Sequence, residues 1–266
     1  MGSISEAVLI DELFESDSLY FEAGAVCVEV EGAIIANMPG LENLAAGSVV
    51  QRIDMQIVST DPEAWLDNIE LHLKKLAIHR ARIYIQSHND LVSTTLLHRG
   101  YRPVNEVALL LHTNSRHIQD KSVTLRPILD QEGWDERLSV YRCIEKGPDG
   151  HVSVPEQWIE LEKSKCNTGY MLPYLIYKNE EVCGAVNLAV HQHLVRLKNM
   201  VIHPDFRRKN CGASAAALFS GLAKQYGKPA AGCYALENHS SLPMYKKAGY
   251  IPVAKQTEWL REIDHG

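Results

Sequence analysis

The chain has 266 residues, of which 45% are hydrophobic, and it carries a formal net charge of −6. This length and composition suffice for one large core or two small ones. The acidic balance argues against a general nucleic-acid binder, and the sequence shows neither an apolar run that could span a bilayer nor a secretory leader. We therefore expect a cytoplasmic protein, monomeric or homodimeric, that binds neither nucleic acid nor membrane.

The cysteines and histidines predict no metal site. Six cysteines are scattered without the spacing of a zinc site or of a disulfide framework, so reduced thiols are the simplest interpretation. Only His191 and His193 share one face of a predicted strand, and two ligands are too few for a structural metal site.

The predicted elements begin with a helix over 64–76 and a strand over 81–86. A further strand ends at His112, and the polar segment that follows it marks a boundary. We therefore predict two domains, residues 1–115 and residues 122–266.

After this boundary, a strand is followed by two helices, three meandering strands, and then helix, strand, helix, strand. The predicted ranges of the two helices and the three meandering strands are 132–146, 155–164, 174–178, 182–191 and 194–202. This order predicts a mixed α/β sheet with helices packed on it.

A basic turn joins the last meandering strand to the next helix. The strand stops at His203-Pro204 and the helix begins near Gly212, so the first N–H groups of the helix lack intrahelical partners. Those donors, the helix dipole and three cationic side chains attract an anion, and a glycine lets a ligand approach the backbone closely. A diphosphate fits better than a carboxylate because it can use several donors at once. The alternative is a solvated basic turn before an ordinary helix.

A second motif, NHSSLPMYKKAGY, places Asn238, Tyr245, Lys247 and Gly249 on a short helix and the turn after it. A phenol has a pKa near 10, so it stays protonated at neutral pH and can donate to a developing anion. The alternative is that Tyr245 only packs the helix onto a terminal strand, with Gly249 ending the helix.

Together the two motifs resemble the acyl-CoA-binding loop and the C-terminal helix–turn of the GNAT superfamily of N-acyltransferases. The resemblance implies two GNAT-like domains, each a mostly antiparallel mixed sheet flanked by helices, and an acyl-CoA cosubstrate, acetyl-CoA by default. The family's loop reads Arg/Gln-x-x-Gly-x-Gly/Ala, and Arg207, Asn210 and Gly212 occupy its fixed places. Asn210 departs from glycine, but asparagine tolerates a left-handed backbone better than other residues with a side chain.

The resemblance also implies roles for single residues. Tyr245 would be the general acid that reprotonates the CoA thiolate, and backbone N–H groups near Met200 and Val201 would polarise the thioester carbonyl. The residues implied in CoA binding are Met200, Val201, Arg207, Arg208, Lys209, Asn210, Cys211, Gly212, Ala213, Asn238 and Lys247.

The general base is not evident from the sequence. Many family members carry a glutamate on the strand before the loop, but residues 195–202 read VRLKNMVI and contain no carboxylate. His193 or His191 on the neighbouring strand, or Glu237 at the end of the next one, could act through a water molecule. For each of them the alternative is a structural or surface role.

The first half of the chain repeats the second at a constant shift, since 238 − 89 and 249 − 100 both equal 149 for the pairs Asn89/Asn238 and Gly100/Gly249. The predicted helix and strand of the first half overlie those of the second half at this shift. A motif, a helix and a strand in one register predict two copies of one fold, with chance similarity as the alternative.

The two copies differ where the chemistry is expected. Val58–Glu63, VSTDPE, stands in place of Arg207–Gly212, RRKNCG, and its two carboxylates would repel a diphosphate. Pro62 lacks an N–H donor, and Leu96 replaces Tyr245. We therefore expect the first half to be a degenerate domain that lacks a CoA site.

The function that follows is an acyl-CoA-dependent N-acyltransferase, which transfers acetyl from acetyl-CoA to the amine of a small molecule or an amino acid. Lys198 would disfavour a polyamine and suit an acceptor that carries a carboxylate. One alternative is a non-catalytic acyl-CoA-binding or scaffolding protein. Another is a tandem transferase that uses aminoacyl-tRNA, against which the intact CoA loop counts.

Overall fold

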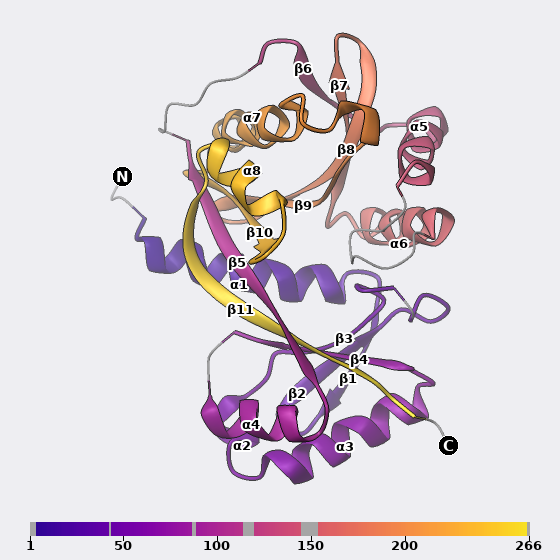
Figure 1. The fold of residues 1–266 in the computed structure, drawn as a ribbon, viewed down its shortest axis with the longest axis vertical. Coiled ribbons are helices and arrows are strands. Elements are labelled where there is room, and N and C mark those ends of the chain that lie inside the picture. Colours follow the sequence, from indigo (N-terminus) through magenta and orange to yellow (C-terminus); the bar gives the residue numbers. More distant parts are fainter. Residues whose placement is uncertain (1–3, 43, 87–88, 114–119, 145–153, 265–266) are drawn as a thin grey trace. The chain divides into compact units, whose positions relative to one another are not determined.

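The computed structural model describes residues 4–42, 44–86, 89–113, 120–144 and 154–264. The chain divides into two compact units (Figure 1). The C-terminal unit comprises Met1–Ser16 and Val107–Ala254, and the N-terminal unit comprises Asp17–Glu106 and Lys255–Gly266. Neither unit is continuous in the sequence.

The N-terminal unit is a mixed sheet with helices. The elements of the first half of the chain are α1 (Glu6–Glu22), β1 (Val26–Val30), β2 (Ala33–Asn37), β3 (Ser48–Gln51), α2 (Met55–Val58), α3 (Pro62–Lys75), β4 (Arg80–Ile85), α4 (Asp90–His98) and β5 (Arg102–His112). The strand order of this unit is β1-β2-β3-β4-β11, antiparallel apart from the parallel pair β3–β4. Trp65, Leu66, Ile69 and Leu73 line the buried face of α3, which packs on the core of the unit.

The C-terminal unit has the order of elements that the sequence predicts. The elements of the second half of the chain are β6 (Val123–Pro127), α5 (Gln131–Arg142), α6 (Pro155–Asn167), β7 (Leu172–Lys178), β8 (Glu181–Val190), β9 (Leu194–Ile202), the 3₁₀ turn η1 (Pro204–Phe206), α7 (Cys211–Gln225), β10 (Ala230–Leu236), α8 (Ser241–Lys247) and β11 (Ile251–Glu262). The strand order is β5-β10-β9-β8-β7-β6. Strands β6 to β9 form an antiparallel meander, whereas β9 and β10 run parallel.

Each half of the chain gives its last strand to the other unit. Strand β5 lies beside β10, and β11 pairs with β4 from Thr257↔Ile85 to Glu262↔Arg80. The units therefore differ from the expected stretches 1–115 and 122–266. Periodicity identifies a strand in the sequence but does not specify which strand it will pair with.

Helix α1 was not predicted from the sequence. Its residues Leu9 and Leu13 are buried in one apolar cluster with Leu194 and Ala230, at the start of β9 and of β10. A Cβ atom on Gly232 would lie 2.7 Å from Leu13 Cδ1, so this glycine allows α1 to pack closely on β10. The first part of α1 thus belongs to the core of the C-terminal unit.

The two halves correspond in structure at the shift seen in the sequence. Helix α3 begins at Pro62 and α7 begins at Cys211, and 211 − 62 equals 149. After the next helix, Gly100 and Gly249 both take a left-handed backbone, with φ of 82° and 96°. The helix and the glycine turn therefore occur in both copies, as the repeat predicts.

Candidate functional site

The predicted site residues gather where the parallel strands β9 and β10 end. Pairing between these strands runs only from Ala230↔Leu194 to Gly232↔Arg196, although the strands continue to Ile202 and Leu236. Parallel neighbours have their carboxyl ends at the same edge of a sheet, which is where ligands of α/β proteins commonly bind. The basic loop follows β9 at this edge, and Glu237 and Asn238 follow β10.

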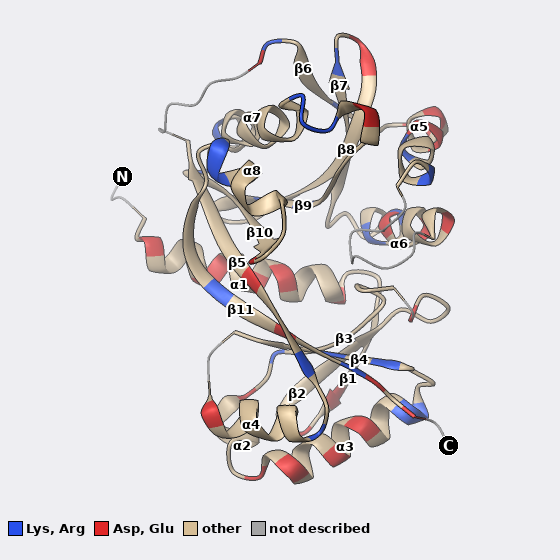
Figure 2. Ribbon diagram, in the orientation of Figure 1, with Lys and Arg blue, Asp and Glu red and all other residues tan. Residues whose placement is uncertain are grey.

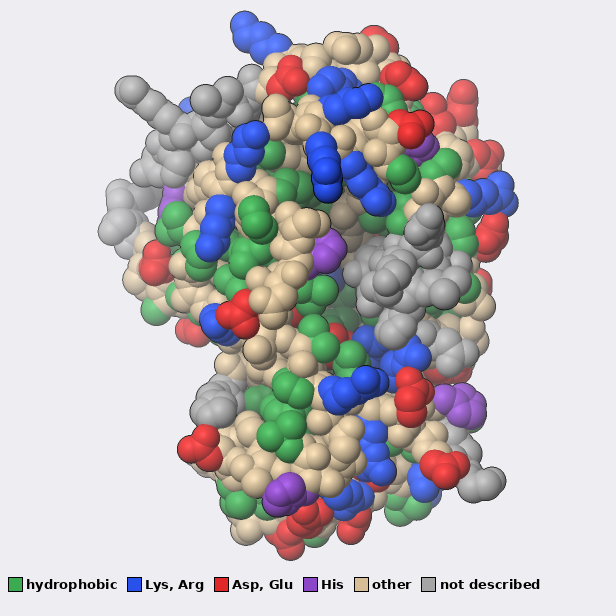
Figure 3. Space-filling model, in the orientation of Figure 1, with side chains coloured by type: hydrophobic (Ala, Val, Ile, Leu, Met, Phe, Trp, Pro, Cys, Tyr) green, Lys and Arg blue, Asp and Glu red, His purple; other side chains and the backbone are tan. Residues whose placement is uncertain are grey.

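The loop between β9 and α7 is an exposed basic segment (Figure 2). Arg207, Arg208 and Lys209 are all exposed, and Lys and Arg side chains gather on the face of the C-terminal unit that Figure 3 shows. Asn210 takes a left-handed backbone with φ of 62°, as its tolerance of that conformation predicts. Among the described residues, no side chain caps the first turn of α7. Its N–H groups and the loop cations therefore converge as an anion site requires.

Two lysines from neighbouring elements hold this loop. Lys247 of α8 donates to Asn210 Oδ1 at 2.7 Å, and Lys178 at the end of β7 donates to the Lys209 carbonyl at 2.9 Å. The sequence grouped Lys247 with the loop but missed Lys178. A contact between residues 31 positions apart leaves no local signal in the sequence.

The first turn of α7 faces the core with its side chains. The Cys211 side chain is buried, and its thiol lies 3.9 Å from the Lys209 carbonyl of the loop. A Cβ atom on Gly212 would lie 2.4 Å from Met244 Sδ of α8. The missing side chain of Gly212 therefore makes room for the packing of α8 on α7, whereas the sequence predicts a role for this glycine in the approach of a ligand.

Tyr245 lies on α8 and is only 5% exposed. Its ring packs edge-on against Tyr250, with 5.5 Å between the ring centroids. Burial, reinforced by the nearby Cys233 thiol, raises the pKa of Tyr245 well above 10, although Arg196 opposes the shift. The phenol is therefore protonated throughout the neutral range, as a proton donor must be.

The three residues considered as general bases lie in different places. His193 precedes β9 and its Nδ1 lies 2.7 Å from Glu12 Oε2, so it is held at the opposite end of the strand. Val201 lies eight positions further along the chain, which in a strand amounts to roughly 26 Å from His193. His191 lies beside Tyr170, with 3.4 Å between Nε2 and the hydroxyl. Only Glu237 is at the edge where the loop lies, and it is half-buried.

A β-bulge interrupts β9 at Asn199 and Met200, where the expected carbonyl-binding N–H groups begin. The register to β8 leaves Asn199 and Met200 opposite Val186 alone, and Asn199 has a φ of 52°. The Asn199 amide donates to Glu162 of α6 at 3.2 Å. Sequence reasoning missed both residues. The polar Asn199 within an otherwise apolar end of the strand was the one available signal.

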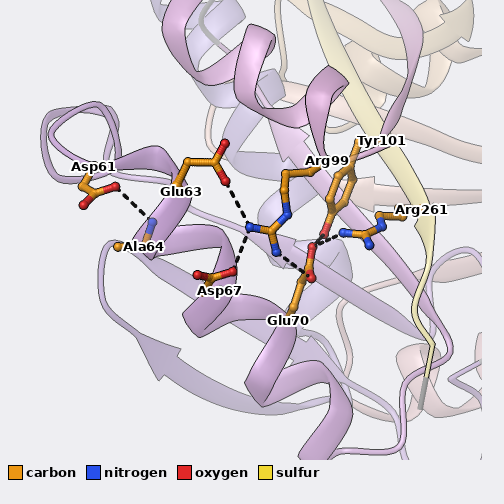
Figure 4. A network of polar contacts seen from close by, with 8 residues as sticks. All are labelled: Asp61, Glu63, Ala64, Asp67, Glu70, Arg99, Tyr101 and Arg261. Atoms are coloured by element: carbon orange, nitrogen blue, oxygen red, sulfur yellow. Dashed lines mark hydrogen bonds and ion pairs between the residues drawn. The ribbon is translucent and has the colours of Figure 1, made fainter. Parts of the chain in front are cut away.

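The corresponding region of the N-terminal unit is closed by its own side chains (Figure 4). Asp61 accepts a hydrogen bond from the Ala64 N–H at 3.0 Å, and Pro62 opens α3. Arg99, after α4, then binds three acidic side chains of α3, namely Glu63 at 3.0 Å, Asp67 at 2.8 Å and Glu70 at 3.0 Å. A helix start with these groups offers an anion fewer donors than α7 does, and no net positive charge.

Within the described residues, no cluster of three or more His, Cys, Asp or Glu side chains is placed to hold a metal ion. In the same residues, no helix combines the length and the apolar character needed to cross a bilayer.

Comparison with a family model and with solved structures agrees with this geometry. Residues 134–250 match the model of the Acetyltransferase (GNAT) family. The match contains the loop, α7 and the whole of α8. A comparison with the sequences of curated proteins finds no match.

Solved structures resemble the chain over most of its length. A GCN5-related N-acetyltransferase from Kribbella flavida has a TM-score of 0.66 at 13% identity, over 99% of this chain and 98% of that one. One from Sphaerobacter thermophilus has a TM-score of 0.62 at 14% identity, over 88% and 78%. A tandem GNAT protein from the clavulanic acid biosynthesis pathway has a TM-score of 0.58 at 10% identity, over 87% and 78%. The similarity covers both halves and confirms the predicted fold class, a mixed sheet flanked by helices.

Proposed function

Because the chain is a member of the GNAT superfamily, we propose that it is an acyl-CoA-dependent N-acetyltransferase whose acceptor is the amine of a small molecule or an amino acid. One observation carries the proposal. An exposed cationic loop meets an uncapped helix N-terminus at the edge where β9 and β10 end. Helix α8, whose Lys247 bonds to Asn210 of the loop, also carries the buried, protonated Tyr245.

The loop residues fit the diphosphate of CoA. Arg207, Arg208 and Lys209 supply charge, and the backbone N–H groups from Asn210 to Ala213 supply donors in the first turn of α7. The bonds from Lys247 and Lys178 hold this loop in one conformation before a ligand arrives. A preformed site of this kind loses less entropy on binding.

The thioester supplies an activated acyl carbonyl, which an amine attacks. In our proposal the N–H groups of Met200 and Val201 stabilise the oxyanion that develops on this carbonyl. Tyr245 then donates its proton to the departing sulfur, for which a raised pKa is suitable. The acceptor amine must be neutral, and Glu237, acting through water, is the group we assign to take its proton.

The acceptor and the compartment are part of the same proposal. Lys198 on β9 would attract an acceptor carboxylate and repel a polyamine, which favours an amino acid. The six cysteines carry free thiols, which supports a reducing compartment such as the cytoplasm.

A panel assay tests the reaction. The protein is mixed with acetyl-CoA and a set of amines and amino acids, and thiol release is compared with release in the absence of acceptor. We expect one class of amine to raise thiol release well above hydrolysis. If CoA binds but no amine raises the rate, the enzymatic function is excluded.

A variant with a damaged loop tests the site. The double substitution Arg207→Glu, Lys209→Glu places two carboxylates on the exposed loop where the diphosphate is expected, and CoA binding measured by calorimetry should be lost. Unchanged affinity in a folded variant would exclude this loop as the CoA site. The matched control is Arg142→Glu, on an exposed arginine of α5 that pairs with Glu156.

A second function, non-catalytic binding of acyl-CoA, is favoured by one observation. The described residues of β9 include no carboxylate, so the position from which a base could act directly is missing. The panel assay separates the two functions, since a binding protein would show CoA affinity without turnover.

A further inference from the structure

A buried polar network reaches the bulge in β9 from helices α5 and α6 of the C-terminal unit. Glu162 of α6 and Arg137 of α5 are both fully buried and form a bidentate ion pair, with bonds of 2.7 Å and 2.8 Å. Pairs in this geometry are directional and hold the planes of both groups in place. The ion pair therefore fixes the two helices to each other at the level of the sheet.

The carboxylate of this pair holds β9 itself. Glu162 Oε1 accepts hydrogen bonds from the Asn199 amide at 3.2 Å, from the Asn187 amide at 2.8 Å and from the Tyr141 hydroxyl at 2.9 Å. Asn199 lies in the bulge on β9, and Asn187 lies on the adjacent strand β8. One buried carboxylate thus bonds to both strands at the place where their register shifts.

The guanidinium holds the opposite side of the bulge. Arg137 Nη1 donates to the Val186 carbonyl at 3.2 Å and to the Tyr174 carbonyl at 3.3 Å. Val186 is the β8 residue that faces the two bulged residues of β9. The ladder is disturbed at a bulge, and this buried cation supplies a donor to a backbone carbonyl there.

We propose that Asn199, held by the Arg137–Glu162 pair, is a positioning residue that sets the orientation of the Met200 and Val201 N–H groups toward the acyl carbonyl. The inference rests on the proposed function, because it assigns these N–H groups to the thioester. Asn199 is in the left-handed region, where it has few alternatives once its amide is bound, and the donors follow directly after it. An error of about 1 Å in such a donor can reduce turnover by about 100-fold.

The substitution Asn199→Gly tests this role. Glycine adopts a φ of 52° freely, so the change removes the amide bond to Glu162 without adding backbone strain. The matched control is Asn179→Gly, at an exposed asparagine with a φ of 49° in the β7–β8 turn. We expect kcat to fall by roughly 10- to 100-fold in Asn199→Gly, with CoA affinity and Tm close to those of the control.

The ratio of the affinities for acetyl-CoA and CoA is a second measurement and needs no turnover. The acyl carbonyl is the group that Met200 and Val201 would bind, so Asn199→Gly should lower affinity for acetyl-CoA and leave affinity for CoA unchanged. Asn199→Asp should give the same pattern if the glycine variant does not fold, because a carboxylate at 3.2 Å from Glu162 is repelled.

The outcomes separate this inference from the proposed function. If the wild type transfers acetyl to an amine and Asn199→Gly keeps both its kcat and its acetyl-CoA to CoA ratio, the positioning role is wrong. If the wild type binds CoA and acetylates nothing, the proposed function fails, and the affinity ratio alone decides the role of Asn199. A loss of CoA affinity equal to that for acetyl-CoA would also contradict the role.

Discussion

The two units begin corresponding helices in opposite ways. At α7 of the C-terminal unit, the first turn has no side-chain cap and follows three exposed cations. At α3 of the N-terminal unit, Asp61 caps the turn, and three carboxylates of the helix share Arg99 (Figure 4). The same helix position is open to a ligand in one copy and satisfied by the protein in the other.

The two helix starts show how one copy of a duplicated fold can lose a ligand site and remain stable. The unsatisfied donors of a helix start are costly unless a cap, water or a ligand takes them. The N-terminal unit meets this requirement with Asp61 and Pro62, which both favour a helix start. The C-terminal unit leaves the donors uncapped and braces the loop with Lys247 and Lys178.

Exchanging the helix starts should have the largest effect. Replacing Arg207–Cys211 with the VSTDP of Val58–Pro62 removes three cations and adds one carboxylate, and it keeps Gly212, which packs against Met244. We expect CoA affinity measured by calorimetry to fall by at least roughly 100-fold, equivalent to about 2.7 kcal/mol. The capped start should preserve the helix, which the Tm checks. Unchanged CoA affinity in the folded variant would show that the helix start does not make the difference between the units.

The substitution Tyr245→Phe, to which Leu96 corresponds in the N-terminal unit, should reduce kcat by roughly 10- to 100-fold because a general acid is lost. CoA affinity should stay within about twofold, since CoA-binding contacts are otherwise kept. Tyr250→Phe is the control: its hydroxyl donates to the Ala216 carbonyl at 3.2 Å, so its loss should cost about 1 kcal/mol of stability and little activity.

The pH profile gives a further check on the same residue. Tyr245 acts in its protonated form, and burial raises its pKa well above 10. A raised pKa extends the protonated form to higher pH, so titration of Tyr245 should cause no decrease in kcat up to pH 10. A decrease in kcat between pH 8 and 10 that disappears in Tyr245→Phe would contradict this assignment.

Breaking the network of Figure 4 should affect stability without affecting CoA binding. Glu70 is 12% exposed and accepts bonds from Arg99, Tyr101 and Arg261 of β11. Glu70→Gln should lower the free energy of unfolding of the N-terminal unit by about 1–3 kcal/mol, measured in urea. Glu63→Gln, at a side chain 55% exposed, should change it by less than about 0.5 kcal/mol. Equal effects of the two would show that burial does not decide the strength of this network.

The smallest effect is expected at the residue that departs from the family's loop pattern. Asn210→Gly keeps the left-handed backbone and removes only the bond from Lys247, so CoA affinity should change by less than about threefold. Asn210→Ala should lower CoA affinity further, because a left-handed backbone at alanine costs roughly 1–2 kcal/mol. A larger loss in the glycine variant would show that Lys247 controls the loop.

Local patterns in the sequence were sufficient for the elements of the C-terminal half. The predicted order of strands and helices is the observed one, and the basic loop lies where β9 ends. These features succeed because periodicity, glycine turns and helix starts act over a few residues. Local patterns did not predict helix α1, because the partners of Leu13 lie some 180 to 220 residues further along the chain, at Leu194 and Gly232.

The candidate site was predictable only in part, for the same reason. The sequence placed Tyr245, Lys247 and Asn210 in one region, and the bond between the last two lies within it. It could not place His193, which its strand carries to the opposite end of β9 beside Glu12. It also missed Glu162, whose bond to Asn199 spans 37 positions and follows no short motif.

The repeat, the contrast between its two copies and the side chains of the basic loop are therefore evident in the sequence alone. These are properties of residue identity and spacing, which a shift of 149 residues makes visible. The exchange of β5 and β11 between the units is visible only in the tertiary structure. The same holds for the Arg137–Glu162 pair that holds the bulge in β9. Strand pairing and buried ion pairs depend on which distant segments meet, and that choice is made by the packing of the whole core.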